Sequence, residues 1–401
     1  MPQHALGREL GLKVNPIPKG VGEKTNFGVT IEGLDLNQIS DTDEQVKALS
    51  ECIWTHKVVV VKGQQSLEPI KQWELVTRFD PDSPQVHSHG DMKTFSKKGG
   101  LLSEKASREV VGIPGAENVR LIGKGFQGED HYGIKNLTIY HGLSNDFHSK
   151  KLPDDEFKAG NSRFQRWHMD APLYARDPAW FTTLRCFKRP TEPMMNIRWD
   201  DDTGLSMKSE PGLTAFFSNV QTYELMSAEE KSIAENSWVE YAPNPYVWIS
   251  KCGGKTNGLG LESEGKELAL EDLGDYELKN VKTYPMVWVN PVTGERAFQV
   301  HGICARKLYL RSSPTEEPRI IDNVEEIRAF LKPIQERVLR PEYILLPAVE
   351  EGDIVMWANY MMFHTAIDYP IEFGARTMHQ ANIGASIGPA QMGLFEIPSL
   401  A

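Results

Sequence analysis

The chain has 401 residues, of which 40% are hydrophobic and 25% are charged, a composition that predicts a globular protein with a sizeable core. The net charge of -11, without a basic block, argues against nucleic acid and anionic membranes as partners, and we recognise no signal peptide and no apolar run of membrane-spanning length. The four cysteines lack metal-site spacing and are predicted to be free thiols, so we expect a cytoplasmic protein, for which a homo-oligomer stays open.

The first half of the chain predicts helices and a buried strand, followed by loops. A capping box at Thr42 predicts the start of a helix, and the valine run at 57–62 predicts a buried strand. A second helix is expected after Pro69. Residues 80–165 are rich in Gly, His, Asp and Ser, and we interpret them as long loops with one strand at 119–123.

The second half of the chain is dominated by strand-like runs. A capping box at Ser227 predicts a short helix, a hairpin is predicted to turn at 290–294, and Pro333 is expected to kink or split a late helix. Many strands with few flanking helices predict a mainly β fold with an antiparallel core, closed or sandwiched, in one domain that covers residues 1–401. The strand-like runs are 180–187, 196–199, 213–217, 353–357, 362–367 and 376–383.

Two familiar motifs are chance matches. GKGFQG at 123–128 fits the glycine pattern of dinucleotide-binding loops, but no amphipathic helix follows it to receive a pyrophosphate. GASIG at 384–388 fits the nucleophile elbow of hydrolases, but no histidine follows it to complete a triad. We therefore reject both functions.

The stretch RWHMDAPLY at 166–174 places an imidazole and a carboxylate two residues apart. On a strand, His168 and Asp170 point to the same face. A histidine and an aspartate directed into an interior are costly unless something pairs with them. The partner can be a metal ion, a proton-relay group or a plain hydrogen bond, and the pair alone does not decide among them.

Two residues near the C-terminus favour the metal ion. His364 lies in one apolar strand-like run, and Arg376 lies twelve residues further on in a second, so a hairpin would place both in one sheet. Two histidines and one carboxylate form the facial triad that holds non-haem Fe(II) and leaves three positions open. An interior arginine is suited to a two-pronged grip on the carboxylate of an oxo-acid co-substrate.

Longer motifs resemble the taurine dioxygenase (TauD/TfdA-like) branch of the Fe(II)/2-oxoglutarate-dependent oxygenases. They run from GVTIEGLDL and IWTHKVVVVKGQ near the start to YPMVWVNPVTGERAFQV, EEGDIVMWAN, FHTAIDY and ARTMHQANI near the end. The resemblance implies a double-stranded β-helix core of the jelly-roll type, with Fe(II) as cofactor and 2-oxoglutarate as co-substrate. It implies that O2 oxidises a small substrate while succinate and CO2 are released, and that the loops at about 80–165 form part of the substrate pocket.

The resemblance also assigns the site residues by position. His168, Asp170 and His364 match the iron ligands, and Arg376 matches the arginine that binds the distal carboxylate of 2-oxoglutarate. A threonine of the family that helps to hold this co-substrate corresponds to Asn196, whose amide can still donate a hydrogen bond. The implied site thus combines a metal ion with an anion clamp.

The position four residues after Arg376 argues against taurine as the substrate. Taurine-type enzymes have a second arginine there, whereas this chain has Gln380, which offers a sulfonate no charged partner. Gln380 and Asn382 together resemble the fungal xanthine dioxygenases of the family, and amides suit the edges of a purine such as xanthine. Further substrate contacts are expected from Arg120 and Tyr140, which align with polar residues of those enzymes.

Alternatives to a purine oxygenase stay open. The same chemistry could act on an amino acid or a secondary-metabolite intermediate, by hydroxylation, desaturation or ring closure, because Arg120 could bind a carboxylate. A metal-dependent hydrolase or a non-catalytic metal-binding barrel could use the same triad, but neither needs Arg376. Gln380 and Asn382 could also serve only to tie neighbouring strands together.

Overall fold

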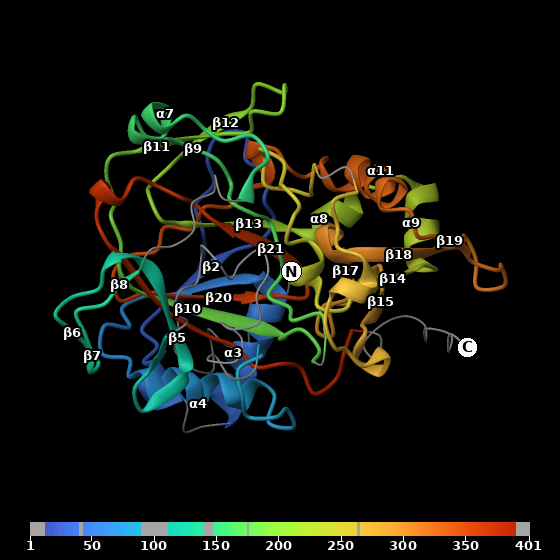
Figure 1. Ribbon diagram of the computed structural model, residues 1–401. Helices are drawn as coiled ribbons and strands as arrows, with labels where there is room; N and C mark the ends of the chain where they lie inside the picture. The colour runs from blue at the N-terminus through green and yellow to red at the C-terminus, as the bar shows by residue number, and fades with distance from the viewer. Residues whose placement is uncertain are drawn as a thin grey trace.

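The fold is mainly β with few helices, as predicted, and its layers are visible in the computed structural model (Figure 1). Among the described residues, no helix is long and apolar enough to cross a membrane. The structure describes residues 13–39, 43–89, 111–139, 147–174, 176–262 and 265–389.

A nine-stranded sheet forms the centre of the molecule, in the order β1-β2-β3-β20-β10-β22-β5-β4, with β8 paired to β5. Neighbours are antiparallel except for β2 and β3. Strands from both ends of the chain therefore lie side by side. Their bounds are Lys13–Pro16 (β1), Val29–Glu32 (β2), Val58–Val61 (β3), Val111–Ile113 (β4), Ala116–Phe126 (β5), Thr138–Ile139 (β8), Phe181–Lys188 (β10), Ile354–Ala358 (β20) and Arg376–Ala381 (β22).

Two helices cover one face of this sheet, below it in Figure 1. Helix α3 (Asp43–His56) contacts β3 and β20, and helix α4 (Pro69–Phe79) contacts β5, β10 and β22. The helix expected after Pro69 is confirmed, and so is the buried valine strand, because every residue of β3 is buried. Thr42, on which the first capping box depends, lies outside the described residues.

The pair of β13 (Thr214–Ser218) and β21 (Met362–Ala366) lies on the opposite side of the main sheet, above it in Figure 1. An isolated antiparallel bridge joins His168 to His364 in β21. The metal-site stretch at 166–174 is therefore attached to this layer. A three-stranded sheet completes the β structure nearby, with strands Asn161–Ser162 (β9), Met195–Arg198 (β11) and Ser206–Ser209 (β12).

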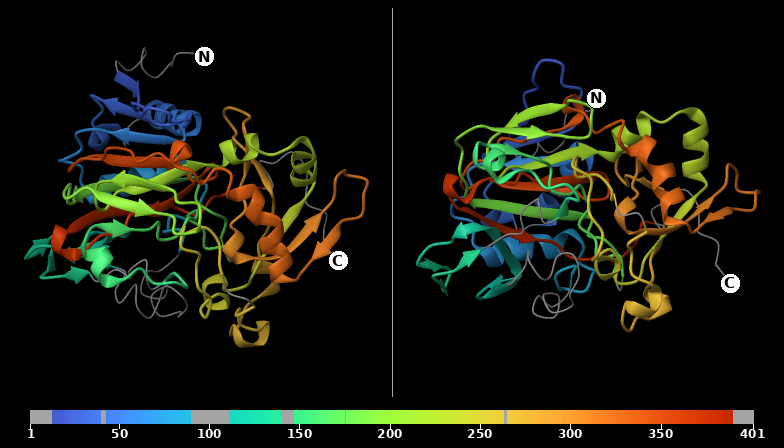
Figure 2. Two further views of the ribbon diagram at one scale, coloured as in Figure 1. Left: turned by 90° about the horizontal axis from the view of Figure 1, so that it is seen from above. Right: turned by 45° about the horizontal axis from the view of Figure 1, so that its top comes forward.

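A lobe built on a four-stranded sheet, in the order β15-β14-β18-β19, lies on the right in Figure 2. The helix predicted after Ser227 is confirmed with its capping box, and the predicted hairpin is β16–β17. Helix α11 runs through Pro333 without being split. Bounds here are Asn219–Glu224 (α8), Ala228–Glu235 (α9), Trp238–Tyr241 (β14), Pro245–Trp248 (α10), Thr283–Pro285 (β15), Val287–Val289 (β16), Arg296–Phe298 (β17), Ala305–Leu310 (β18), Arg319–Ile321 (β19) and Val324–Gln335 (α11).

The segment expected to consist of loops contains the longest strand of the protein's main sheet. Strand β5 has 11 residues and includes the strand expected at 119–123. The glycine motif begins inside this strand, which agrees with its rejection as a dinucleotide loop. The remaining short elements are Leu36–Ile39 (α2), Asp130–His131 (β6), Ile134–Lys135 (β7) and Asp154–Lys158 (α7).

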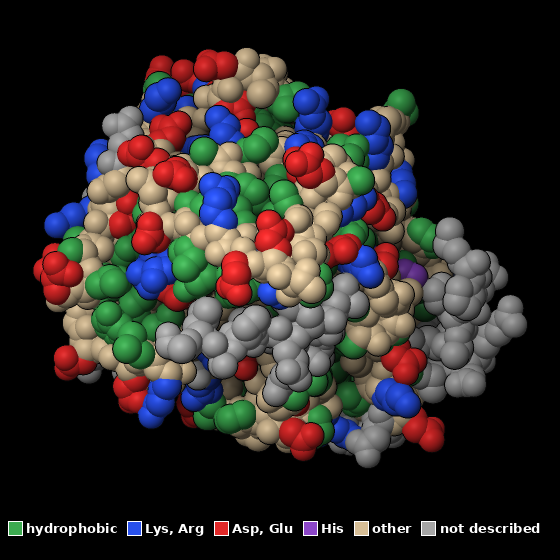
Figure 3. Space-filling view, turned by 90° about the vertical axis from the view of Figure 1, so that its right-hand side faces the viewer, with side chains coloured by type: hydrophobic (Ala, Val, Ile, Leu, Met, Phe, Trp, Pro, Cys, Tyr) green, Lys and Arg blue, Asp and Glu red, His purple; other side chains and the backbone are tan. Residues whose placement is uncertain are grey.

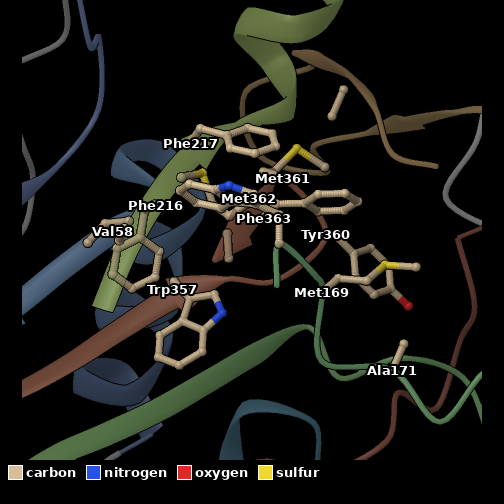
Figure 4. Close-up of a cluster of buried hydrophobic side chains, with 14 of the residues drawn as sticks. Val58, Met169, Ala171, Phe216, Phe217, Trp357, Tyr360, Met361, Met362 and Phe363 are labelled. Carbon is tan, nitrogen blue, oxygen red and sulfur yellow. The ribbon is translucent and has the colours of Figure 1, made fainter. Parts of the chain in front are cut away.

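Residues beside the candidate ligands belong to the hydrophobic core. Phe363 lies in the buried cluster of Figure 4, whereas its neighbour His364 lines a cavity; Met169 belongs to the same cluster and also reaches the cavity between His168 and Asp170. Side chains alternate between the two faces of an extended chain. The same segments therefore anchor the fold with one face and carry the polar site on the other.

Candidate metal centre

A cavity of about 250 Å³ lies between the main sheet and the β13–β21 pair. Strands β5, β10, β20 and β22 contribute to one wall, and β13 and β21 contribute to the other. Of the residues that the sequence predicts for the site, the cavity is lined by Arg120, His168, Asp170, His364, Arg376 and Gln380.

The two histidines lie directly opposite each other on neighbouring segments. The backbone N–H of His168 donates to the carbonyl of His364 at 3.1 Å, and the reverse hydrogen bond measures 2.9 Å. The ring centroids are 4.3 Å apart. Oδ1 of Asp170 lies 3.9 Å from Nε2 of His168 and 3.7 Å from Nε2 of His364. One ligand atom from each residue lies within 4.8 Å of the others, a grouping that no other His, Cys, Asp or Glu set matches in the described part of the chain.

The carboxylate of Asp170 is held by three donors on one oxygen. Its Oδ2 accepts hydrogen bonds from Oγ1 of Thr182 at 2.8 Å, from Nε2 of Gln380 at 3.4 Å and from Nδ2 of Asn382 at 3.5 Å. Oδ1 is thereby directed at the two imidazoles. Donors to the distal oxygen of a metal-binding carboxylate fix its orientation and its charge.

The backbone of Asp170 is held by a buried amide. Its N–H donates to Oδ1 of Asn359 at 2.8 Å, and Nδ2 of Asn359 donates back to its carbonyl at 2.8 Å. Asn359 is fully buried and lies between β20 and β21. Because β21 carries His364, this side chain ties two parts of the triad together.

Both imidazoles are neutral and present a lone pair. Nδ1 of His168 lies 2.8 Å from the carbonyl of Arg166, which can only accept, so Nδ1 is the donor and Nε2 is free to bind a metal. Burial, helped by the charge of Arg166, lowers the pKa of His364 to about 3. Burial also holds the pKa of His168 well below its ordinary value. A divalent cation would therefore displace no proton from either ring.

Arg376 is a buried cation that lacks an anionic partner. Its Nε donates to the carbonyl of Gly212 at 2.8 Å, and one Nη lies 3.5 Å from Oγ1 of Thr214. No carboxylate of the described residues pairs with it, although it is only 6% exposed and lines the cavity. Burial lowers its pKa, yet an arginine keeps its charge in proteins. The cavity thus contains a permanent positive charge suited to an anionic ligand.

Gly212 leaves room for this guanidinium. A Cβ at this position would lie 3.1 Å from Cδ of Arg376 and 3.1 Å from a ring carbon of Tyr369. The backbone φ of +71° is also one that side chains other than glycine rarely adopt. A glycine is thus favoured here for two separate reasons, the backbone conformation and the close approach of Arg376.

Asn196 lies away from the position expected of a co-substrate ligand. It belongs to β11, its Nδ2 donates to Oδ1 of Asn161 at 3.2 Å, and it does not line the cavity. The hydroxyl beside Arg376 is that of Thr214, in β13. The role of Asn196 as a co-substrate ligand therefore stays a prediction, and the strand that carries it is separated from β13 by residues 200–213.

The predicted substrate amides contact the protein itself. Gln380 lines the cavity, but its amide donates to Asp170. Asn382 is fully buried: it donates to Oγ1 of Thr182 at 3.1 Å and accepts from Oγ of Ser88 at 2.6 Å. Asn382 is not among the residues that line the cavity. Both amides therefore support the carboxylate of the triad.

Arg120 lies at the cavity, where we expected a residue that contacts the substrate. It lines the cavity from β5 and lies opposite Gln380 in the register of β5 with β22. Tyr140 falls outside the described residues.

Sequence reasoning missed Thr182, Thr214 and Asn359. Thr182 and Thr214 lie within apolar strand-like runs, Asn359 lies just after one, and all three are buried. A polar side chain in such a run needs a hydrogen-bond partner, and this was the available signal. The residue types alone could not show that the partners are Asp170 and Arg376.

A neutral two-histidine, one-carboxylate cluster beside a buried guanidinium defines a metal-dependent enzyme centre. The family model of "Taurine catabolism dioxygenase TauD, TfdA family" matches residues 109–381. The chain therefore belongs to this family, and the expectation of an enzyme, an Fe(II)- and 2-oxoglutarate-dependent dioxygenase, is confirmed at this level.

Curated relatives cover almost all of the chain. It is 41% identical over 375 residues to alpha-ketoglutarate-dependent dioxygenase bsc9 of Alternaria brassicicola, covering 92% of this chain and 93% of that protein. It is 42% identical over 359 residues to alpha-ketoglutarate-dependent dioxygenase fc-dox of Phomopsis amygdali, with 88% of each chain covered. It is 34% identical over 377 residues to alpha-ketoglutarate-dependent xanthine dioxygenase xanA of Emericella nidulans, covering 94% and 98%.

Solved structures agree on the fold. The structure of AAD-2 in complex with Mn(II) and N-oxalylglycine matches with a TM-score of 0.54 at 14% identity, over 94% of this chain and 99% of that one. A putative alpha-ketoglutarate-dependent taurine dioxygenase from Burkholderia xenovorans matches with a TM-score of 0.52 at 16% identity, over 94% and 92%. At these identities the likeness concerns the fold alone.

Proposed function

We propose that this dioxygenase binds Fe(II) through His168, Asp170 and His364 and binds the distal carboxylate of 2-oxoglutarate through Arg376. The observation that carries the proposal is the combination of two features in one cavity: three ligand atoms within 4.8 Å of one another, and a buried guanidinium with no carboxylate partner among the described residues. A hydrolase or a passive metal-binding barrel has no use for the second feature.

The donor set fits the metal that the family uses. Two neutral imidazoles and one carboxylate are the ligands of mononuclear Fe(II) oxygenases, and they leave coordination positions for a co-substrate and O2. When bound, Fe(II) and 2-oxoglutarate supply the oxidative chemistry, in which O2 oxidises the substrate while succinate and CO2 are released. The protein supplies ligand geometry, anion binding and a cavity that limits water.

Each role can be assigned to side chains of this chain. The carbonyl of Arg166 fixes the tautomer of His168, and Thr182 orients the carboxylate of Asp170. Arg376 neutralises one carboxylate of the co-substrate, and Thr214 adds a hydroxyl beside it. The apolar walls Trp357 and Leu184 exclude water from the reacting centre.

We also propose that the two layers around the cavity form a double-stranded β-helix. The pair β13–β21 faces β10, β20, β22 and β5 across the cavity, which supports this arrangement. The assignment of residues 1–401 to one domain, with a pocket-forming insertion at about 80–165, stays a prediction, as do the cytoplasmic location and a homo-oligomer.

Two substrate classes remain for this enzyme. Xanthine is the first, and relatives named xanthine dioxygenases at 34–35% identity support it. The second is an amino acid or a secondary-metabolite intermediate. The amides that suggested a purine, Gln380 and Asn382, donate to Asp170, which favours the second class.

Co-product formation tests the proposed reaction. Purified protein with Fe(II) and 2-oxoglutarate is incubated with xanthine, with amino acids and with taurine, and succinate and O2 consumption are measured. We expect succinate release that a chelator abolishes and Fe(II) restores. Substrate turnover without O2 consumption would identify a hydrolase, and failure to bind either Mn(II) or 2-oxoglutarate would refute the proposed centre.

A further inference from the structure

A second arginine lines the cavity beside the metal centre. Arg166 lies two residues before His168, and its backbone is fixed at both ends: its N–H donates to Oγ1 of Thr365 at 2.9 Å, and its carbonyl accepts from His168. Its side chain therefore starts from the same rigid segment as the triad. Its charge acts on both histidines and contributes to their lowered pKa values.

The guanidinium of Arg166 has aromatic neighbours and no anionic one. It lies 5.3 Å from the ring centroid of Tyr246 and 6.0 Å from that of Phe147. Nη1 is buried and has no hydrogen-bond partner among the described residues, and none of their carboxylates forms an ion pair with the side chain. A buried donor that stays unsatisfied is costly, so this atom indicates a missing acceptor.

The backbone around Phe147 and Tyr246 fixes the positions of these two rings. A Cβ on Gly254 would lie 2.1 Å from a ring carbon of Phe147, so only glycine allows the ring to occupy its place. The backbone of Gly254 donates to the carbonyl of Phe147 at 2.7 Å. Tyr246 lies in α10, which follows a residue with left-handed backbone. Two segments far apart in the sequence thus hold rings beside the Arg166 side chain.

The charges around the cavity do not balance. The described lining residues include four cations, Arg120, Lys124, Arg166 and Arg376, and two carboxylates, Asp170 and Asp368. Lys124 pairs with Asp368 at 2.8 Å. Bound Fe(II) and 2-oxoglutarate carry opposite charges of equal size and cancel. Neither of the two lining carboxylates, Asp170 and Asp368, forms an ion pair with Arg166, so its charge is available to another ligand.

The surface of the molecule differs from this cavity. Acidic and basic side chains are interspersed over the face seen in Figure 3. Surface cations such as Arg337 and Arg296 pair with Glu230 and Glu235. These two surface arginines thus have carboxylate partners, which Arg166 lacks among the described residues.

We propose that the substrate of this enzyme is an organic acid whose carboxylate is bound by Arg166 and whose apolar part lies against Tyr246 and Phe147. The proposal rests on the proposed function, because it assumes that Arg376 is occupied by 2-oxoglutarate. It also changes the interpretation of Gln380. A neutral residue at that position means that the substrate's anionic group is bound by a different segment of the chain, and does not mean that the substrate lacks an anionic group.

Matched ligands test this assignment by binding alone. Protein loaded with Mn(II) and 2-oxoglutarate is titrated calorimetrically with 3-phenylpropanoate and indole-3-acetate, and with the primary amides of both acids. We expect at least one acid to bind about tenfold or more tightly than its amide, because a charge-assisted hydrogen bond is lost in the amide. Equal affinities of acid and amide, or no binding of either acid at millimolar concentration, overturn the proposal.

Variants of Arg166 test whether this residue causes the preference for the acid over its amide. Arg166→Gln should lower the affinity for the acid to that of the amide, Arg166→Lys should retain part of the preference, and Arg319→Gln, at an exposed arginine of β19, should change nothing. Titration of 2-oxoglutarate into the Mn(II)-loaded protein is the control that distinguishes binding of the substrate from binding of the co-substrate. Loss of 2-oxoglutarate affinity in Arg166→Gln would assign Arg166 to the co-substrate and overturn the proposal, whereas a parent protein that binds neither Mn(II) nor 2-oxoglutarate would refute the proposed function instead.

Discussion

The two ends of the cavity are built on different principles. At the metal end, each functional group is held by other protein groups: Asp170 accepts from Thr182 and Asn359 holds its backbone. At the substrate end, beside the metal centre, the guanidinium of Arg166 lies against two aromatic rings, and its Nη1 has no acceptor among the described residues. The groups at the metal end have hydrogen-bond partners within the protein, whereas at the substrate end a hydrogen-bond donor of Arg166 is left for the substrate.

This difference shows how one chemistry can be retained while specificity changes. The metal end depends on short contacts between β10, β20, β21 and β22, so a substitution there disturbs several bonds at once. The substrate end depends on side chains from separate segments outside these strands, which can change one at a time. The following predictions test whether the two ends are as independent as the geometry indicates.

The largest effect is expected from the carboxylate of the triad. Asp170→Asn keeps the shape of the side chain but removes the charge that offsets a divalent cation, so we expect complete loss of metal-dependent succinate release and of measurable Mn(II) binding. Calorimetric titration with Mn(II) checks this. The variant should still unfold at a temperature near that of the metal-free parent, since an amide also accepts a hydrogen bond from Thr182. Unchanged Mn(II) affinity would remove Asp170 from the ligand set.

The next effect concerns the co-substrate. Arg376→Gln leaves one carboxylate of 2-oxoglutarate buried without its partner, which costs about 3–5 kcal/mol for such pairs, or roughly two to three and a half orders of magnitude in the 2-oxoglutarate requirement. KM for 2-oxoglutarate measures it, and Mn(II) affinity should stay within a few-fold of the parent. Gly212→Ala is a second route to the same defect, because its Cβ would crowd Arg376. A variant that binds the co-substrate normally contradicts the assignment.

Smaller losses are expected from the groups that orient Asp170. Thr182→Val and Asn382→Leu keep approximate volume but remove donors to Oδ2 or to its partner, and loss of such a contact costs about 10- to 100-fold in metal affinity. Mn(II) titration is the measurement. The purine interpretation of Asn382 makes the opposite prediction: KM for the substrate would rise while metal affinity stayed unchanged.

The metal end could largely be predicted from the sequence, for a physical reason. His168 and Asp170 are two residues apart on an extended segment, so local geometry alone places them on one face. His364 and Arg376 lie in strands whose apolar neighbours indicate burial. The short valine strand and the helix after Pro69 were likewise local patterns.

The substrate end could not be predicted in the same way. Arg166 is adjacent to the triad in sequence, but nothing local shows that its side chain meets Tyr246, which is 80 positions away. Gln380 and Asn382 were assigned to the substrate because their chemistry suits a purine, and only the fold reveals that Asp170 uses their donors. Contacts that depend on loops from distant parts of the chain leave no periodic pattern to interpret.

The smallest predicted effect decides between two candidates for one role. The sequence suggested Asn196 as a helper of 2-oxoglutarate, whereas Oγ1 of Thr214 lies 3.5 Å from the guanidinium of Arg376. A single neutral hydrogen bond contributes about 0.5–1.5 kcal/mol, so Thr214→Val should raise KM for 2-oxoglutarate about two- to tenfold. Asn196→Ala should leave it unchanged, because Asn196 contacts Asn161 outside the cavity. A rise in KM for Asn196→Ala alone would mean that sequence position predicts this contact better than the arrangement of strands does.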